Sequence, residues 1–327
     1  MKLSLAKTMM TVEQMVGTVG VLPTPATPDA ERWDARQTVN LAETERMVAA
    51  VVGGGIDILM TTATFGEVAS LTWEELHAFA DCVIRTAAPR PVFVGVTTLN
   101  TRDTIERART LVDMGAAGIF AGRPMLMKLD DRQIVRYYHD LAAALPGVPI
   151  IVYDNAGTFR GKISIDVYQE LAATTPEIIA ARQAGGRETY DDVEALGDRI
   201  RFMVNDKSWL PLARRYPDRA LACWSGNVAC GPGAVVALSR AILSRDWDAA
   251  EAIQQKLEWA AETMYPTGTH DGAFSDYSIQ LCHIRLQAAG FIDPGPCRPP
   301  YIGVPEEYVA GAEEVGRRLR QLHEQYG

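Results

Sequence analysis

The chain has 327 residues, of which 47% are hydrophobic, and a formal net charge of −9 without a basic stripe. This charge balance makes nucleic acid and anionic membranes poor partners, because both bind clusters of Lys and Arg. No apolar stretch approaches the roughly 20 residues of a membrane-spanning helix, and Met1–Met10 lacks the apolar core of a signal peptide. Five cysteines without paired spacing indicate free thiols in a reducing compartment, so we expect a cytoplasmic protein.

Runs rich in Val, Ile, Phe and Ala recur along the first two thirds of the chain. They show little strict alternation of apolar and polar residues, which is typical of strands buried on both faces of a parallel sheet. The runs span Gly17–Leu22, Ile56–Thr61, Pro91–Thr97, Ala117–Ala121, Val148–Tyr153, Glu177–Arg182, Arg199–Val204 and Ala220–Trp224.

Helix start and stop signals lie between these runs. Thr72 and Glu75 have the spacing of a capping box, in which hydroxyl and carboxylate each satisfy a backbone N–H group. Asn40 and Asn100 precede two further helical stretches as N-caps, and Gly115 ends the second of them. The sequence therefore predicts a helix after each strand.

Eight β-then-α units with right-handed crossovers predict a (β/α)8 TIM barrel. An open doubly wound sheet is the alternative, but Leu22–Pro25 lacks the Gly-x-Gly-x-x-Gly turn that would favour it. Beyond Asp246 the pattern is helical only. We predict a barrel with a short N-terminal segment over residues 1–245, and a C-terminal helical extension packed on it over 246–327. Its helices are expected at Trp247–Met264, Ser275–Ala289 and Glu306–Tyr326.

Chemistry in such a barrel belongs at the C-terminal ends of the strands. Those segments carry hydroxyls, amides, a tyrosine and cations with few free carboxylates, which suits a small anionic substrate such as a 2-oxo acid. The Thr64–Gly66 turn could offer a hydroxyl and successive backbone N–H groups to a carboxylate, or Thr64 could merely cap a helix. The five histidines form no metal-ligand pattern, so we expect neither a metal nor a cofactor.

Several segments carry a family resemblance. Ala63–Glu67 followed by Leu71–Glu75 resembles the Gly-Thr-Thr-Gly-Glu turn of the dihydrodipicolinate synthase and N-acetylneuraminate lyase superfamily. Pro23–Ala30, Leu99–Arg102 and Gly295–Tyr301 resemble its trans-o-hydroxybenzylidenepyruvate hydratase-aldolase branch, which splits aryl-substituted unsaturated 2-oxo acids into an aldehyde and pyruvate. The resemblance spans nearly the whole chain. It implies a (β/α)8 barrel, a homotetramer, and a lyase that forms a Schiff base through a lysine on strand six.

The resemblance also implies roles for residues at the strand ends. Tyr153 matches the tyrosine that relays protons to and from the reacting carbon and hydroxyl. The Thr64–Gly66 turn matches the carboxylate cradle, and the indole of Trp224 could stack on the aryl part of the substrate. The substrate-binding candidates are Thr64, Phe65, Gly66, Asn155, Trp224 and Ser225.

Strand six departs from the family pattern, because its alignment without a gap places Arg182 on the lysine position. A guanidinium stays protonated in proteins and offers no free amine, so Arg182 cannot form an iminium. It could instead pin a carboxylate or an oxyanion and so stabilise an enolate. Lys207, just past strand seven, is either a relocated nucleophile or a solvated loop lysine paired with Asp206.

Three functions remain open on this basis. The favoured one is a lyase of aldolase or hydro-lyase type acting on a 2-oxo acid or aryl-substituted pyruvate adduct, with Tyr153 as acid and base and Arg182 or Lys207 as the cationic centre. The second is a lysine-independent cyclase, decarboxylase or dehydratase of a specialised pathway. The third is a non-catalytic binding protein, which the many polar strand ends disfavour.

Overall fold

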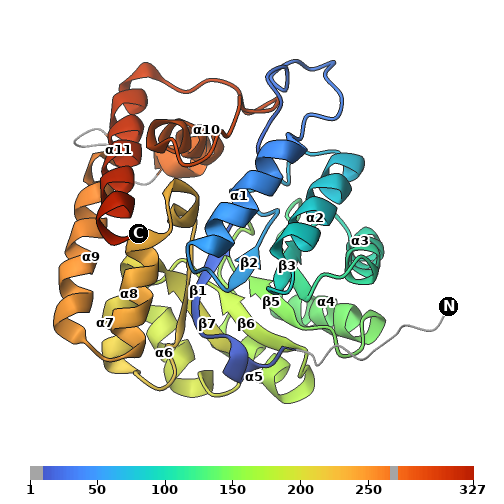
Figure 1. Ribbon diagram of the computed structural model, residues 1–327. Helices are drawn as coiled ribbons and strands as arrows, with labels where there is room; N and C mark the ends of the chain where they lie inside the picture. The colour runs from blue at the N-terminus through green and yellow to red at the C-terminus, as the bar shows by residue number, and fades with distance from the viewer. Residues whose placement is uncertain (1–9, 266–271) are drawn as a thin grey trace. The chain divides into compact units, whose positions relative to one another are not determined.

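The computed structural model describes residues 10–265 and 272–327. Its parallel strands follow one another in chain order around a closed barrel, which confirms the predicted TIM barrel (Figure 1). Each strand lies within a predicted run or ends one residue beyond it. The strands are β1 (Gly17–Val21), β2 (Ile58–Met60), β3 (Val92–Gly95), β4 (Gly118–Ala121), β5 (Ile150–Tyr153), β6 (Ile178–Arg182), β7 (Arg201–Asn205) and β8 (Ala222–Ser225).

Register places the last residues of neighbouring strands beside one another. Every residue of β1 to β5 is buried, as expected where both faces of a strand are covered. Tyr153 of β5 pairs with Arg182 of β6, and Asn205 of β7 pairs with Trp224 of β8. Because both pairs lie at the C-terminal ends of their strands, side chains separated by many residues are brought together.

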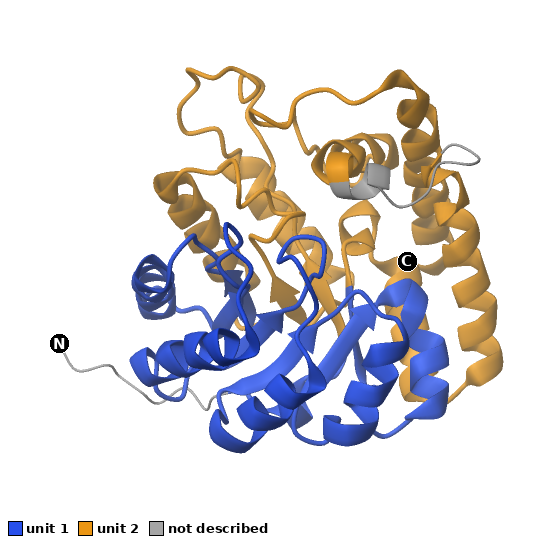
Figure 2. Ribbon diagram, turned by 180° about the vertical axis from the view of Figure 1, so that it is seen from behind, with its two compact units in different colours: residues 1–17, 91–224 blue, residues 18–90, 225–327 orange. Residues whose placement is uncertain are grey.

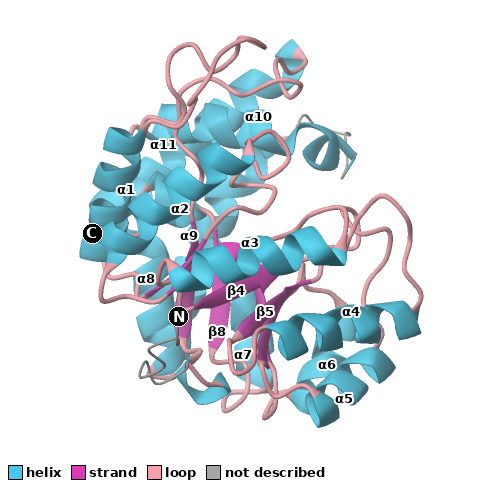
Figure 3. Cartoon of the chain, turned by 90° about the vertical axis from the view of Figure 1, so that its right-hand side faces the viewer, coloured by secondary structure: helices cyan, strands magenta, loops and turns pink. Residues whose placement is uncertain are grey.

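A helix follows each strand (Figure 3). The N-caps predicted at Asn40 and Asn100 are confirmed. Asn40 accepts a hydrogen bond from the Glu43 N–H, and Asn100 does the same for Asp103. The barrel helices are α1 (Leu41–Gly53), α2 (Trp73–Ala87), α3 (Thr101–Asp113), α4 (Asp131–Ala144), α5 (Ile165–Thr174), α6 (Arg187–Leu196), α7 (Trp209–Arg215) and α8 (Gly233–Leu243). Short 3₁₀ turns are η1 (Val12–Gln14), η2 (Asp206–Ser208), η3 (Asn227–Cys230), η4 (Glu262–Met264) and η5 (Glu306–Tyr308).

The predicted C-terminal helices are also present. They are α9 (Trp247–Ala261), α10 (Gly272–Ala289) and α11 (Val309–Tyr326), and α11 packs against α8, α9 and α10 (Figure 1). Within the described ranges, none of the helices combines the length and the apolar character that crossing a membrane requires.

The chain divides into two compact units, each of which combines separate parts of the sequence (Figure 2). Unit 1 comprises Met1–Gly17 and Pro91–Trp224, and unit 2 comprises Thr18–Arg90 and Ser225–Gly327. The candidate site residues fall into both units, and each unit is described by itself below. The predicted domain boundary between residues 245 and 246 stays a prediction.

Candidate active site

Arg182 ends strand β6 in unit 1 and lies against two aromatic rings. Its guanidinium carbon is 3.6 Å from the ring centroid of Trp224 and 5.1 Å from that of Tyr153. Burial lowers the pKa of Arg182, while the nearby Tyr153 and Asp154 act in the opposite direction. A guanidinium remains charged at neutral pH even so. The end of β6 therefore carries a fixed positive charge with planar N–H donors, held on an aromatic face.

The indole of Trp224 in β8 is held by a hydrogen bond to the residue that follows β6. Its Nε1 donates to the backbone oxygen of Gln183 at 2.7 Å. The side chain of Gln183 is buried, and its Nε2 donates to Asp192 Oδ2 at 2.8 Å. These contacts fix the plane of the indole, and with it the aromatic surface on which Arg182 lies.

Tyr153 ends strand β5 with its ring buried and its hydroxyl in contact with an amide. The ring packs 4.7 Å from Phe120 and, edge to face, 5.1 Å from Phe159, measured between ring centroids. Asn155 Nδ2 lies 3.3 Å from the Tyr153 hydroxyl, and Asn155 Oδ1 accepts from the Gly157 N–H at 3.1 Å. The phenol is thus held by the rings of Phe120 and Phe159 and by the Asn155 amide, which the Gly157 N–H orients.

A buried ion pair beside Tyr153 was not foreseen from the sequence. Arg123 follows β4 and Asp154 follows β5, and their Nη2 and Oδ1 atoms lie 3.2 Å apart. Tyr168 Oη donates to the other carboxylate oxygen at 3.0 Å. Burial raises the pKa of Asp154, although Arg123 counteracts this. The sequence does contain a basis for predicting this ion pair, because charged residues that follow neighbouring parallel strands meet at one edge of the sheet.

Two lysines of unit 1 lie near the ends of strands β5 and β7. Lys207 is in η2 with an exposed side chain, and its backbone N–H donates to Asp206 Oδ1 at 2.8 Å and Asn205 Oδ1 at 3.2 Å. Lys162 Nζ lies 2.9 Å from the buried Asp192, the same carboxylate that Gln183 contacts. The sequence favours Lys207 as the candidate nucleophile, whereas Lys162 shares the Asp192 carboxylate with Gln183, the residue that follows Arg182.

The Thr64–Gly66 turn in unit 2 has tight backbone geometry. A Cβ on Gly66 would lie 2.7 Å from the Thr62 nitrogen, so this position excludes any side chain. Thr24 Oγ1 donates to the Gly66 oxygen at 2.9 Å. The residues on either side, Thr62 and Glu67, have left-handed φ angles of 50° and 56°. The turn is therefore a defined local structure rather than an ordinary helix start.

Phe65 and Ser225 belong to a second cluster of unit 2. The Arg285 guanidinium from α10 lies 5.5 Å from the Phe65 ring centroid, and its Nη1 donates to Asn227 Oδ1 at 2.7 Å. Ser225 is fully buried, and its Oγ accepts from the Asn227 N–H at 3.0 Å. No local pattern in the sequence predicts that α10 brings a cation to this cluster.

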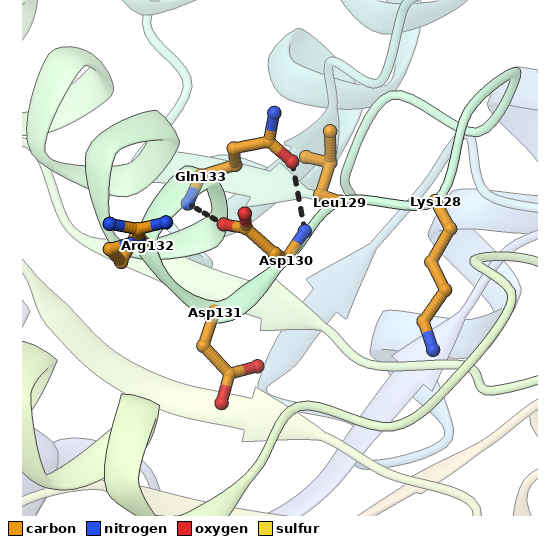
Figure 4. A pocket seen from close by; sticks show the side chains of 6 residues that line it. All are labelled: Lys128, Leu129, Asp130, Asp131, Arg132 and Gln133. Atoms are coloured by element: carbon orange, nitrogen blue, oxygen red, sulfur yellow. Dashed lines mark hydrogen bonds between the residues drawn. The ribbon is translucent and has the colours of Figure 1, made fainter.

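An open depression of about 720 Å³ lies at the start of α4 (Figure 4). Asp130 and Gln133 cap the helix there through reciprocal hydrogen bonds of 2.8 and 2.9 Å. None of the predicted site residues lines this depression, so the strand ends remain the better candidate. Its lining consists of Lys128, Leu129, Asp130, Asp131, Arg132 and Gln133. Among the described residues, no group of three or more His, Cys, Asp or Glu side chains could hold a metal ion.

The model of the dihydrodipicolinate synthetase family matches residues 18–315. The chain belongs to this family. It is 46% identical over 321 residues to the trans-2'-carboxybenzalpyruvate hydratase-aldolase of Nocardioides sp. (strain KP7), covering 97% of this chain and 96% of the relative. It is 37% identical over 324 residues to the trans-O-hydroxybenzylidenepyruvate hydratase-aldolase of Pseudomonas putida, covering 98% and 97%.

Two solved structures share the fold of this chain. "PhdJ bound to substrate intermediate" superposes with a TM-score of 0.95 at 46% identity, covering 98% of this chain and 100% of that one. The Ruminococcus gnavus sialic acid aldolase has a TM-score of 0.80 at 15% identity, covering 96% and 99%, and shows the shared fold alone. The predicted superfamily and the predicted enzyme class, a lyase, are thereby confirmed. Placing Arg182 on the family's lysine position stays a prediction.

Proposed function

We propose that this family member is a hydratase-aldolase for aryl-substituted unsaturated 2-oxo acids in which the Arg182 guanidinium, not an amine, stabilises the reacting ketone. The observation that carries the proposal is the position of Arg182, stacked on Trp224 and next to Tyr153 at adjoining strand ends. The substrate class follows the two hydratase-aldolases with which the chain shares 46% and 37% identity over almost its whole length.

The reaction has two steps. Water first adds across the carbon–carbon double bond, with the hydroxyl on the carbon next to the ring and the proton on the carbon next to the ketone. A base then takes the hydroxyl proton, and the bond between these two carbons breaks. The electron pair of that bond moves into the ketone as an enolate, which takes up a proton at carbon to give pyruvate. The other product is the aromatic aldehyde.

Each side chain has a place in these steps. Tyr153 takes the proton from the hydroxyl and returns one to the enolate carbon, with Asn155 orienting its phenol. Arg182 donates to the enolate oxygen, where charge develops, and needs no covalent bond to do so. The Thr64–Gly66 turn binds the substrate carboxylate through backbone N–H groups. Trp224 supplies an aromatic surface for the aryl ring beside the cation.

Lys207 is the alternative cationic centre, acting through a Schiff base. A nucleophilic lysine is activated by desolvation or by a neighbouring cation such as Arg182, and exposure of Lys207 disfavours the first of these routes. Arg182, by contrast, is held against Trp224 and Tyr153, and this position favours the noncovalent route. The homotetramer is likewise a proposal, and it rests on the family resemblance alone.

A turnover assay tests the proposed reaction. The purified chain is incubated with trans-2'-carboxybenzalpyruvate and with trans-o-hydroxybenzylidenepyruvate, and pyruvate and aldehyde are quantified separately. We expect the two products in equal amounts. The variant Tyr153→Phe should lose about 10²-fold or more in kcat, the range of a single acid–base group. If neither compound is cleaved, or if Tyr153→Phe turns over at the wild-type rate, the proposed function is wrong.

A further inference from the structure

A buried carboxylate directly follows the Thr64–Gly66 turn. Glu67 is fully buried in unit 2, and its Oε1 lies 2.8 Å from His283 Nε2 and 2.9 Å from Arg298 Nη1. His283 belongs to α10, and Arg298 belongs to the Pro-Cys-Arg-Pro-Pro run near the C-terminus. Two cations from the C-terminal part of the chain thus meet one carboxylate at the turn.

Arg298 is saturated with hydrogen bonds and only 2% exposed. Its Nη1 also donates to the Thr24 oxygen at 3.1 Å, and its Nη2 donates to the Thr38 and Pro25 oxygens at 2.9 and 3.3 Å. Its Nε donates to Thr38 Oγ1 at 2.7 Å. Thr24 in turn donates its hydroxyl to Gly66. Arg298 therefore connects the segment after β1 to Glu67, at the C-terminal end of the turn.

His283 has an acceptor at each ring nitrogen. Nδ1 lies 2.9 Å from the Gly295 oxygen, and Nε2 lies 2.8 Å from Glu67. Both contacts are hydrogen bonds only when both nitrogens carry protons, so the ring is an imidazolium. Glu75, which accepts from the Thr38 N–H and hydroxyl, adds a second carboxylate near Arg298. The cluster therefore balances two cations with two carboxylates.

The turn itself needs such support. Thr62 and Glu67 both have left-handed φ angles, a conformation that side chains other than glycine rarely adopt. A backbone of this kind persists only where its surroundings fix it. Hydrogen bonds from His283 and Arg298 to Glu67, and from Thr24 to the Gly66 oxygen, hold the C-terminal end of the turn.

We propose that Glu67, His283 and Arg298 form a positioning cluster that holds the Thr64–Gly66 turn in its carboxylate-binding conformation. The inference rests on the proposed role of that turn. The C-terminal run then acts in substrate recognition through Glu67 without touching the substrate. A cluster that served stability alone would change the melting temperature of variants while leaving the affinity of the folded protein for a 2-oxo acid unchanged.

Binding of pyruvate, measured by isothermal titration calorimetry, tests the inference without requiring turnover. The variants are His283→Gln, which keeps size and one donor but no charge, and Arg298→Lys, which keeps the charge but not the planar set of donors. Arg320→Gln is the matched control, because Arg320 is exposed on α11 and forms an ion pair with Glu324 at the surface. All proteins are compared at a temperature at which their near-ultraviolet circular dichroism matches that of the wild type.

We expect Kd for pyruvate to rise about tenfold or more in His283→Gln and Arg298→Lys, as for the loss of one charged hydrogen bond, and to stay unchanged in Arg320→Gln. Folded His283→Gln and Arg298→Lys proteins with wild-type Kd values would overturn the inference. So would a wild type that does not bind pyruvate, because the turn would then hold no carboxylate. A wild type that binds pyruvate but cleaves no aryl substrate contradicts the proposed function instead.

Discussion

Arg182 and the Schiff-base lysine of the family differ in what they can do for a ketone. An amine forms an iminium and draws electrons covalently, whereas a guanidinium acts only through charge and hydrogen bonds. The contact of 3.6 Å with Trp224 gives this guanidinium a fixed orientation, which preorganised electrostatic stabilisation requires. In the proposed mechanism, the stabilisation of the enolate therefore depends on how firmly Arg182 is held.

Replacing the aromatic ring of Trp224 should leave the Arg182 guanidinium less firmly oriented. For Trp224→Leu we expect kcat/KM for the aryl 2-oxo acid to fall by about tenfold to thirtyfold, since a cation–π contact at a desolvated site contributes up to about 2 kcal/mol. Trp224→Phe retains an aromatic ring, so its kcat/KM should fall less. Steady-state kinetics with pyruvate detection measure both variants. Equal activity of Trp224→Leu and wild type would show that the stack has no part in catalysis.

Among the strands, the sequence predicts which residues lie at the C-terminal ends. Tyr153, Arg182 and Trp224 were named from the ends of buried apolar runs, and the structure places all three in one cluster of unit 1. Glu67, His283 and Arg298 were not foreseen as partners, because no periodic pattern relates residues so far apart in the chain. Their contact arises from the packing of α10 and the C-terminal run, which local sequence does not encode.

The start of α2 offers a test of local structure. Thr72 Oγ1 accepts from the Glu75 N–H at 3.3 Å, and Glu75 Oε2 accepts from the Thr72 N–H at 2.9 Å. We expect Thr72→Ala to lower the free energy of unfolding by about 1 kcal/mol, the usual loss for an N-cap hydroxyl, and Thr72→Ser to lower it far less. Urea denaturation measures both. A Thr72→Ala protein as stable as the wild type would contradict the capping role.

For the whole molecule, the repeat of strand and helix was enough to predict the barrel, because each βα unit shows its period and its caps locally. The division into two compact units could not be predicted in this way. Each unit joins parts of the chain that are distant in sequence, such as Thr18–Arg90 with Ser225–Gly327. Which parts share a unit depends on packing between helices and loops, as in the contacts that tie Arg298 to Thr24 and Thr38.

The buried imidazolium of His283 makes stability depend on pH. Burial alone lowers the pKa of His283, but hydrogen bonds with Cys297 and Glu67 outweigh this and raise it to about 10. The groups around it are Glu67, Cys297 and Cys282, with Arg298 beyond Glu67. A raised pKa stabilises the folded state fully below the unfolded value of about 6.5, and this contribution is lost as the pH rises toward 10.

We therefore expect the free energy of unfolding to decline between about pH 6.5 and pH 10, with a weaker decline in His283→Gln. Urea titrations at a series of pH values measure the slope. An equal slope in wild type and His283→Gln would show that another group causes the decline. At acid pH, burial acts to raise the pKa of Glu67, but His283 and Arg298 outweigh it and lower the pKa. The stability that ionised Glu67 contributes is therefore lost only as the pH falls through this lowered pKa.

Borohydride trapping shows whether the cation at the end of β6 assists cleavage without a covalent bond. The wild type is incubated with pyruvate and sodium borohydride, and its mass and residual turnover are measured, with an aldolase that has a Schiff-base lysine as the positive control. We expect no covalent adduct and retained turnover, because Arg182 forms no iminium. A reduced pyruvyl adduct on Lys207, or on any other lysine, together with loss of turnover would contradict the claim.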